Sequence, residues 1–332
     1  MKLELAAFTP RGEQLAEQLA EELTARGHQA AQTRDGCSAK EWTARAFGRA
    51  QGLIFVGAAG IAVRSIAPCL RHKSTDPAVV VVDEGGQYAI PLLSGHLGGA
   101  NDLAREIAVC LNGQAVITTA TDVSGVFAVD QWARREGLAV CNPESIVRIS
   151  SALLRGQEVS LWSRWHIAGD LPDGLVWGTR AEADVAVDWC RPSERALWLC
   201  PRTLRAGIGC RRGTGAETIR TLVQAVLEKE HLSPLGLEAV CSLSLKGDEP
   251  GLLAFCQELR VPLVTYSPAE LAQVPGDFQG SPFVERVTGV DNVCERAALA
   301  AGGMLLRRKT VGDGVTCALA GRTPQLDWRD GR

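Results

Sequence analysis

The sequence predicts an α/β protein: two α/β domains with mainly parallel sheets, joined by a small irregular middle region. Short aliphatic runs alternate with amphipathic stretches over the first 125 residues, and the pattern restarts at Leu204. Between them, six tryptophans and a Gly-Asp-Leu-Pro-Asp-Gly stretch interrupt the alternation. We therefore expect an N-terminal domain over 1–124, a middle linking region over 125–202, a C-terminal domain over 203–322 and a frayed tail over 323–332.

Composition excludes several classes of protein. The chain has 332 residues, of which 46% are hydrophobic and 22% charged, and its net charge is −3, so a nucleic-acid partner is not expected. There is no apolar run long enough for a membrane span and no signal-peptide pattern, which predicts a cytoplasmic protein. Its eleven cysteines include no CxxC pair, so we expect reduced, packed thiols and no resident metal.

The N-terminal elements follow from periodicity and caps. Strands are predicted over 3–8, 53–57, 79–82, 88–93 and 115–119, the third and fourth forming a strand-turn-strand pair around Asp83 to Gly86. Helices are predicted over 14–25, after the capping box Ser38 to Glu41, at the glycine-containing loop Ala58 to Arg64, which stands at a helix start, and through Leu103 to Leu111, where apolar residues recur every four.

The C-terminal elements follow in the same way. Strands are predicted over 204–208, 237–243, 263–266, 304–307 and 315–319. Helices are predicted after capping boxes at Thr214 to Glu217 and at Ser267 to Glu270, from Pro250 to Leu259, and over 291–301. The tryptophans between the two domains are interpreted as packing residues, with a stacking surface for a flat ligand as the alternative.

Three polar loops follow N-terminal strands, at Gly57 to Arg64, Ser94 to Asp102 and Thr118 to Asp122. Ligands of open α/β sheets sit at the carboxyl ends of strands, so we expect the three loops to converge on one crevice. The second loop, Ser-Gly-His-Leu-Gly-Gly-Ala-Asn-Asp, stands at a helix start, where glycines and unpaired N–H groups favour an anion or an oxygen that becomes one.

His96 in that loop suits a general base or acid, because the ordinary imidazole pKa is about 6.5. Ser94 lies two residues away, but no acid is assigned to orient the ring, so a covalent Ser–His mechanism is not established. The alternative is a structural histidine that holds the glycine loop.

In the second half, Gly207-x-Gly209-x-x-x-Gly213 follows a strand but departs from the dinucleotide fingerprint, because its third glycine falls one place late. Arg211 and Arg212 between these glycines suit carboxylate recognition, and the alternative is a solvated pair. Lys246 and Glu249 are interpreted as a surface ion pair at a helix start, or as a proton-transfer pair.

These residues carry a family resemblance. In the first half the motifs are Gly57-Ala-Ala-Gly-Ile-Ala-Val-Arg-Ser-Ile-Ala-Pro68, Leu92-Leu-Ser-Gly-His-Leu-Gly-Gly-Ala-Asn101 and Ile117-Thr-Thr-Ala-Thr-Asp122. In the second half they are Gly207-Ile-Gly-Cys-Arg-Arg-Gly-Thr214, Lys246-Gly-Asp-Glu249, Ser281-Pro-Phe-Val284 and Gly314-Val-Thr316. The combination resembles the CbiG family of cobalamin biosynthesis, the cobalt-precorrin-5A hydrolases, over roughly 50–320.

The resemblance implies a hydrolase that opens the δ-lactone of a cobalt tetrapyrrole and releases a two-carbon unit as acetaldehyde. We then expect His96 as general base, an oxyanion held by Ser94 and its glycine neighbours, and substrate carboxylates bound by Arg64, Arg211 and Arg212 in a cleft between the two α/β domains. The candidate catalytic residues are His96, Ser94, Lys246 and Glu249. The candidate substrate-binding residues are Gly57, Gly60, Arg64, Gly95, Gly98, Gly99, Asn101, Thr119, Thr121, Asp122, Gly209, Arg211, Arg212 and Thr214.

No cofactor is expected, because cobalt arrives in the substrate. The expected partners are that anionic cobalt tetrapyrrole and neighbouring pathway methyltransferases, with no nucleic acid or membrane; a homo-oligomer stays open. Two alternative functions are a non-catalytic tetrapyrrole-binding or channelling protein and a nucleotide-dependent oxidoreductase.

Overall fold

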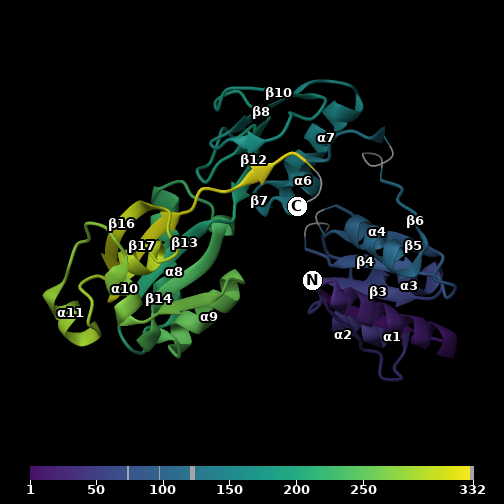
Figure 1. Cartoon of the computed structure of the whole chain (residues 1–332), viewed down its shortest axis with the longest axis horizontal. Coiled ribbons are helices and arrows are strands. Elements are labelled where there is room, and N and C mark those ends of the chain that lie inside the picture. Colours follow the sequence, from purple (N-terminus) through teal and green to yellow (C-terminus); the bar gives the residue numbers. More distant parts are fainter. Residues whose placement is uncertain (73–74, 97, 120–123, 330–332) are drawn as a thin grey trace. The chain divides into compact units, whose positions relative to one another are not determined.

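The computed structural model describes residues 1–72, 75–96, 98–119 and 124–329. The chain divides into two compact units, Met1–Arg134 and Arg135–Arg332. Both are built from mainly parallel sheets with interleaved helices, so the predicted α/β class is confirmed (Figure 1). None of the helices in the described ranges has the length and apolar character needed to span a bilayer.

The first unit contains a six-stranded sheet in the order β2-β1-β3-β4-β5-β6. Its strands are β1 (Lys2–Ala7), β2 (Gln29–Gln32), β3 (Gly52–Val56), β4 (Ala78–Val82), β5 (Tyr88–Leu93) and β6 (Gln114–Ala115). The pairs are parallel except β4 with β5, which form the predicted hairpin; β6 in turn runs parallel to β5. The strands β5 and β6 therefore run opposite to the other four.

Helices cover both faces of this sheet because successive strand residues point to opposite sides. Ile54 packs in a cluster with α1 (Pro10–Ala25) and α4 (Ala100–Leu111), whereas its neighbour Phe55 packs with α2 (Ala39–Ala46) and α3 (Ala59–Ile66). The capping box predicted at Ser38 is present, with the Glu41 amide donating to the Ser38 hydroxyl. These contacts fix where each interstrand loop emerges.

The strand predicted over 115–119 is shorter than expected. β6 ends at Ala115, and its pairing with β5 extends only to the Val116 N–H, which donates to the Ala89 carbonyl. As an edge strand β6 has a single neighbour, so nothing on its other side prolongs it. Thr118 and Thr119 consequently lie in irregular backbone just beyond the sheet.

The middle region is more regular than the sequence predicts. It forms a five-stranded sheet in the order β10-β8-β11-β12-β7, parallel except between β12 and β7. The strands are β7 (Leu138–Val140), β8 (Val159–Ser163), β10 (Leu175–Trp177), β11 (Val185–Val187) and β12 (Leu197–Pro201), with helices α6 (Val129–Arg135) and α7 (Ile146–Leu154). Three of these strands have only three residues, too few for a period-two pattern to show.

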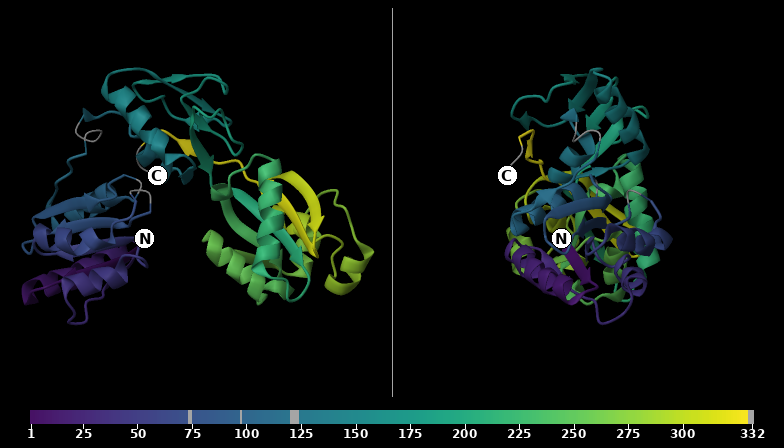
Figure 2. Two further views of the ribbon diagram at one scale, coloured as in Figure 1. Left: turned by 180° about the vertical axis from the view of Figure 1, so that it is seen from behind. Right: turned by 90° about the vertical axis from the view of Figure 1, so that its right-hand side faces the viewer.

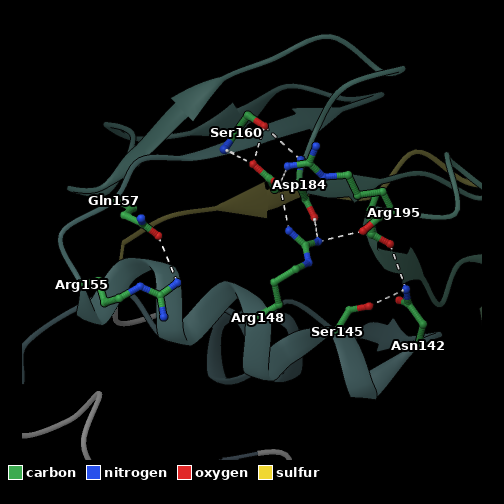
Figure 3. Close-up of polar contacts among 9 residues, drawn as sticks. Asn142, Ser145, Arg148, Arg155, Gln157, Ser160, Asp184 and Arg195 are labelled. Carbon is green, nitrogen blue, oxygen red and sulfur yellow. Dashed lines mark hydrogen bonds and ion pairs between the residues drawn. The ribbon is translucent and has the colours of Figure 1, made fainter.

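Asp184 joins this sheet to α7. Its carboxylate accepts from the Ser160 amide and hydroxyl on β8 and pairs with Arg148 of α7 at 2.9 Å and with Arg195 at 3.1 Å (Figure 3). The arginine and serine hydrogen bonds keep the pKa of the Asp184 carboxyl below its usual range despite burial. The network thus holds α7 against the middle sheet.

The C-terminal sheet of the second unit has the order β15-β14-β13-β17-β16. Its strands are β13 (Leu204–Cys210), β14 (Leu237–Leu243), β15 (Leu263–Tyr266), β16 (Met304–Gly312) and β17 (Val315–Gly321). The apolar faces of α8 (Ala216–Lys229) and α9 (Pro250–Leu259) pack on one side; α10 (Pro268–Gln273) and α12 (Cys294–Leu299) pack on the other. The left view of Figure 2 shows α8 along its face of the sheet. Helix α11 (Pro282–Thr288) and 3-10 turns at Ala67–Cys69, Pro143–Ser145, Pro234–Gly236 and Ser244–Lys246 complete the described elements.

Three C-terminal predictions need correction. The capping box at Thr214 is wrong: the N-cap of α8 is Gly215, and the Thr214 hydroxyl donates back to the Arg211 carbonyl. The helix predicted over 291–301 is confined to Cys294–Leu299. The tail is not frayed through its described part, because β18 (Leu326–Asp327) pairs with β9 (Ile167–Ala168) and Trp328 is buried. By contrast, the capping box at Ser267 with its N1 proline is confirmed.

Candidate functional site

The three N-terminal loops do not share one edge of the sheet. β5 runs antiparallel to β4, and β4 runs parallel to β3, so the carboxyl end of β5 lies at the edge opposite to that of β3. Ser94 follows β5, whereas Gly57 and Gly60 follow β3. The Arg64 guanidinium folds back toward Gly60, where an added Cβ would lie 3.6 Å from Nη1. The expected convergence of Gly57, Gly60 and Arg64 with the histidine is therefore wrong.

The residues Ser94–His96 and Gly98–Asn101, called the histidine loop, lead into α4, and Gly99 is its N-cap. Ser94 adopts a left-handed φ of 56°, and Gly99, the N-cap residue, has a φ of 83°. A Cβ on Gly98 would collide with Ser94, and one on Gly99 would collide with the Arg134 guanidinium. The packing of the loop itself therefore accounts for these two glycines. The sequence analysis had attributed them to the close approach of a ligand.

An acid that the sequence did not reveal lies beside His96. The Oδ2 atom of Asp130, on α6, lies 3.2 Å from His96 Nδ1, and both side chains are about nine-tenths buried, with 12% and 10% exposed. A proton held on Nδ1 toward the carboxylate puts the basic lone pair of a neutral ring on Nε2. The contact with Asp130 supplies the acid that the sequence left unassigned, and it is compatible with His96 as a general base and with His96 as a residue that holds the loop.

Two of the predicted oxyanion donors are already used within the loop. The Ser94 hydroxyl donates to the Asp76 carbonyl at 2.9 Å, and a hydroxyl has only one hydrogen to give. The Gly99 N–H donates to the His96 carbonyl at 2.9 Å. In this conformation neither Ser94 Oγ–H nor the Gly99 amide can donate to an oxyanion, so that part of the prediction needs correction.

Asn101 and Thr119 are brought together as predicted for one edge of the sheet, but Asn101 is not placed to touch a ligand. Its side chain is 1% exposed, packs over Gly95 and donates from Nδ2 to Thr119 Oγ1 at 3.0 Å. Asn101 thus ties the histidine loop to the segment after β6. The candidates Thr121 and Asp122 lie outside the described residues.

In the second unit, the segment Gly209–Thr214, called the arginine loop, follows β13. Just before it, a Cβ on Gly207 would collide with the Cys294 carbonyl, and one on Gly209 would lie 2.7 Å from Thr316 Oγ1. The spacing of these glycines thus reflects the close approach of α12 and β17 to β13. This packing accounts for the glycine pattern without a dinucleotide.

Lys246 and Glu249 form the predicted ion pair, with Nζ 2.9 Å from Oε2, but the pair is not on the surface. Their side chains are 17% and 5% exposed, and Glu249 Oε1 also accepts the Gly213 N–H at 2.6 Å. The Lys246 ammonium, followed by the Gly213 amide, lowers the pKa of the Glu249 carboxyl below its usual 4.5. Glu249 therefore stays ionised at neutral pH, and its hydrogen bond from the Gly213 N–H holds the arginine loop.

A pocket of about 450 Å³ opens at the carboxyl ends of β13 and β14. Gly209, Arg211, Arg212 and Lys246 from the predicted set line it, whereas Thr214 turns back to its own loop. Burial raises the pKa of the Cys210 thiol and, to about 11, that of Cys294, so both lining thiols are protonated at neutral pH. The pocket is therefore cationic and contains no thiolate nucleophile among its lining residues.

Sequence reasoning missed three residues that the structure places in these sites: Asp130, Arg134 and Lys309. Asp130 lies 34 residues from His96 on a helix that carries no motif, and only tertiary packing brings the two together. Lys309 is the last residue of the basic run Arg307-Arg308-Lys309, and this run is the signal in the sequence that could have indicated a cationic site.

Three family models match most of the chain. "Cobalamin synthesis G N-terminal" matches residues 41–122, "Cobalamin biosynthesis central region" matches 127–204, and "Cobalamin synthesis G C-terminus" matches 204–320.

Full-length relatives agree. A cobalt-precorrin-5A hydrolase of Salmonella typhimurium is 40% identical over 294 residues, covering 83% of this chain and 84% of that one. A protein of the same name from Priestia megaterium is 34% identical, covering 81% and 78%. A solved homologue of cobalamin biosynthesis protein G from Sulfolobus solfataricus is 23% identical over 97% of both chains, with a TM-score of 0.44. By the three family-model matches and by its identity to the two hydrolases over most of its length, the chain belongs to the CbiG family of cobalamin biosynthesis.

Proposed function

We propose that the chain is a cobalt-precorrin-5A hydrolase, which opens the δ-lactone of its substrate and releases acetaldehyde to give cobalt-precorrin-5B. The full-length relatives named for this activity support the reaction, and the contact between His96 and Asp130 supports the place of the chemistry. Cobalt enters with the substrate, so the protein supplies proton transfer, hydrogen bonds and cationic groups.

In the first step His96 Nε2 takes a proton from a water as the water oxygen attacks the lactone carbonyl. The resulting imidazolium is stabilised by the Asp130 carboxylate 3.2 Å from Nδ1. The tetrahedral oxyanion needs preorganised donors, each of which contributes about 2.7–4 kcal/mol in sites of this kind. The backbone amides of Gly95 and Gly98 in the histidine loop are our candidates.

When the intermediate collapses, the C–O bond to the ring oxygen breaks and the imidazolium returns its proton to that oxygen. The freed hydroxyl is then deprotonated by the same base. Its oxygen forms a carbonyl, the adjacent C–C bond breaks, and the electron pair passes into the conjugated macrocycle. The two-carbon fragment leaves as acetaldehyde, so a single base serves both stages.

Substrate carboxylates are bound by Arg211 and Arg212, whose guanidinium groups suit two-pronged hydrogen bonding to carboxylates. Lys246 also lines the pocket, and its ammonium is paired with the Glu249 carboxylate at 2.9 Å. Lys246 and Glu249 act here through charge and loop position, rather than as the acid and base of the reaction.

Acetaldehyde release from purified protein and cobalt-precorrin-5A, followed by coupled reduction to ethanol, tests this proposal. We expect turnover by the parent chain and a loss of at least about 100-fold in His96→Ala, the scale of general base catalysis. Turnover by His96→Ala within a few-fold of the parent would remove His96 from the chemistry. Tight binding of the substrate without acetaldehyde in the parent would favour a carrier protein instead.

A further inference from the structure

The pocket beside the arginine loop has a composition that the catalytic step does not explain. Its mouth carries two apolar side chains in contact with solvent, Leu245 with 55% and Val287 with 63% exposed. Exposed aliphatic residues at a concave site are unfavourable in water and are stabilised when an apolar ligand surface covers them. The pocket therefore favours a ligand with a broad apolar face.

The same lining is strongly cationic. Arg211, Arg212 and Lys309 contribute to it, whereas the Lys246 ammonium is paired with the Glu249 carboxylate at 2.9 Å. Asp291 is the one acidic residue among the described lining. Asp291 does not offset this charge, because its carboxylate pairs with Arg296 at 2.9 Å. The ligand should therefore carry several negative charges at the rim of its apolar face.

Lys309 lies at an irregularity in the pairing of two strands, which sets its backbone position. The pairing of β16 with β17 shifts register between Arg307 and Thr310, which is the behaviour of a β-bulge. The Lys309 N–H freed there donates at 2.6 Å to Glu295, a fully buried carboxylate that also accepts from Asn292. A buried carboxylate must be hydrogen bonded, so Glu295 fixes the bulge and with it the direction of Lys309.

We propose that this pocket binds one carboxylate-bearing edge of the tetrapyrrole macrocycle, and that it does so independently of the chemistry at His96. The aliphatic side chains at the mouth cover the flat face, and Lys309 joins the arginines at the rim. The pocket volume of about 450 Å³ suits part of a macrocycle with its side arms. The assignment rests on the proposed function, and it divides binding and proton transfer between two separate groups of residues.

The test is an absorbance titration of the full chain with uroporphyrin III, a flat tetrapyrrole with a carboxylate on every side chain. Val287→Glu places a negative charge at the mouth and should weaken binding about tenfold or more, while Lys309→Gln removes one cation and should weaken it several-fold. Val147→Glu is the matched control, since Val147 is 56% exposed on α7 and should alter affinity by no more than about twofold.

Two further outcomes separate this proposal from the hydrolase assignment. His96→Ala should bind uroporphyrin as the parent does, because the catalytic ring takes no part in holding this edge. If Val287→Glu binds as tightly as the parent, or if the parent does not bind uroporphyrin, the pocket assignment is wrong. If the parent chain binds uroporphyrin, Val287→Glu weakens this binding, and the parent releases no acetaldehyde from cobalt-precorrin-5A, then the pocket assignment is supported and the proposed hydrolase activity is wrong.

Discussion

The Asp130 carboxylate lies 3.2 Å from His96 Nδ1, and the pair is enclosed within the first unit. Replacing Asp130 with Asn keeps the size but exchanges the acceptor for an amide that can donate to Nδ1 and favour the wrong tautomer. We expect acetaldehyde formation to fall by about 10²–10⁴-fold. Asp173→Asn, at an exposed loop position, is the control and should retain parental turnover.

A pH profile distinguishes this positioning role from a general loss of structure. In Asp130→Asn the imidazolium loses its counter-charge, so the limb on the acid side of the kcat/KM profile, where the general base becomes protonated, should move to lower pH relative to the parent. An unchanged profile with a uniformly reduced amplitude would show that Asp130 only supports the fold.

Gly99→Ala should destabilise the first unit and impair turnover, because alanine meets both a φ of 83° and the Arg134 guanidinium. We expect a loss of about 1–3 kcal/mol in the free energy of unfolding, measured by urea denaturation. Gly27→Ala is a control in the same unit, since Gly27 has a φ of 92° but no atom within 4 Å of an added Cβ. Equal losses in the two variants would mean that the arginine contact has no energetic consequence.

Glu249→Gln should reveal a pH-dependent contribution to stability. Because the folded pKa of Glu249 lies below its usual 4.5, its contribution is fully present above that value and is lost as the pH falls through the lower, folded value. We expect Glu249→Gln to be about 1–3 kcal/mol less stable than the parent at neutral pH, with the difference shrinking in acid.

The control for that series is Glu194→Gln, whose side chain is 94% exposed. It should follow the parent at every pH. A gap between Glu249→Gln and the parent that stays constant from neutral to acid pH would contradict the ion-pair interpretation.

Arg211→Gln together with Arg212→Gln should raise KM for cobalt-precorrin-5A about tenfold or more, because charge-assisted hydrogen bonds to the substrate carboxylates are lost. Arg64→Gln should leave KM within about twofold, because Arg64 lies at the edge of its sheet opposite to the histidine loop. Steady-state kinetics of the two variants decide the point. A large KM effect of Arg64→Gln would show that the substrate reaches that other edge.

Helix caps and hydrophobic periodicity predicted most of the helices and strands, because both signals depend on residues that are close together in the sequence. The capping boxes at Ser38 and Ser267 are present, and β5 and β14 have the predicted bounds. The short strands of the middle sheet were not predictable in this way, since Val185–Val187 is ordered by its neighbours on both sides rather than by its own sequence.

The candidate site shows the same division. His96 stood out as the one imidazole in a glycine-rich loop at a helix start, whereas Asp130 depends on the packing of a helix that has no motif. The prediction that Arg64 and His96 share a site could have been corrected from the sequence. The hairpin turn Asp83 to Gly86 implies that β5 runs antiparallel to β4, and this direction places the carboxyl end of β5 at the edge of the sheet opposite to that of β3. Strand direction, rather than loop composition, decides which loops can meet.

Trp189 belongs to the middle region but is buried in the same core as Leu204 and Leu319 of the C-terminal sheet, and a Cβ on Gly321 would lie 2.5 Å from its ring. The indole therefore fills space in a hydrophobic core that the middle region and the C-terminal sheet share. A fragment that begins at residue 204, where the C-terminal family model begins, would lack Trp189 and would have a cavity lined by aliphatic side chains in its core. The second unit should consequently melt as one cooperative body, and dissection at the family boundary would yield a fragment that either repacks or aggregates.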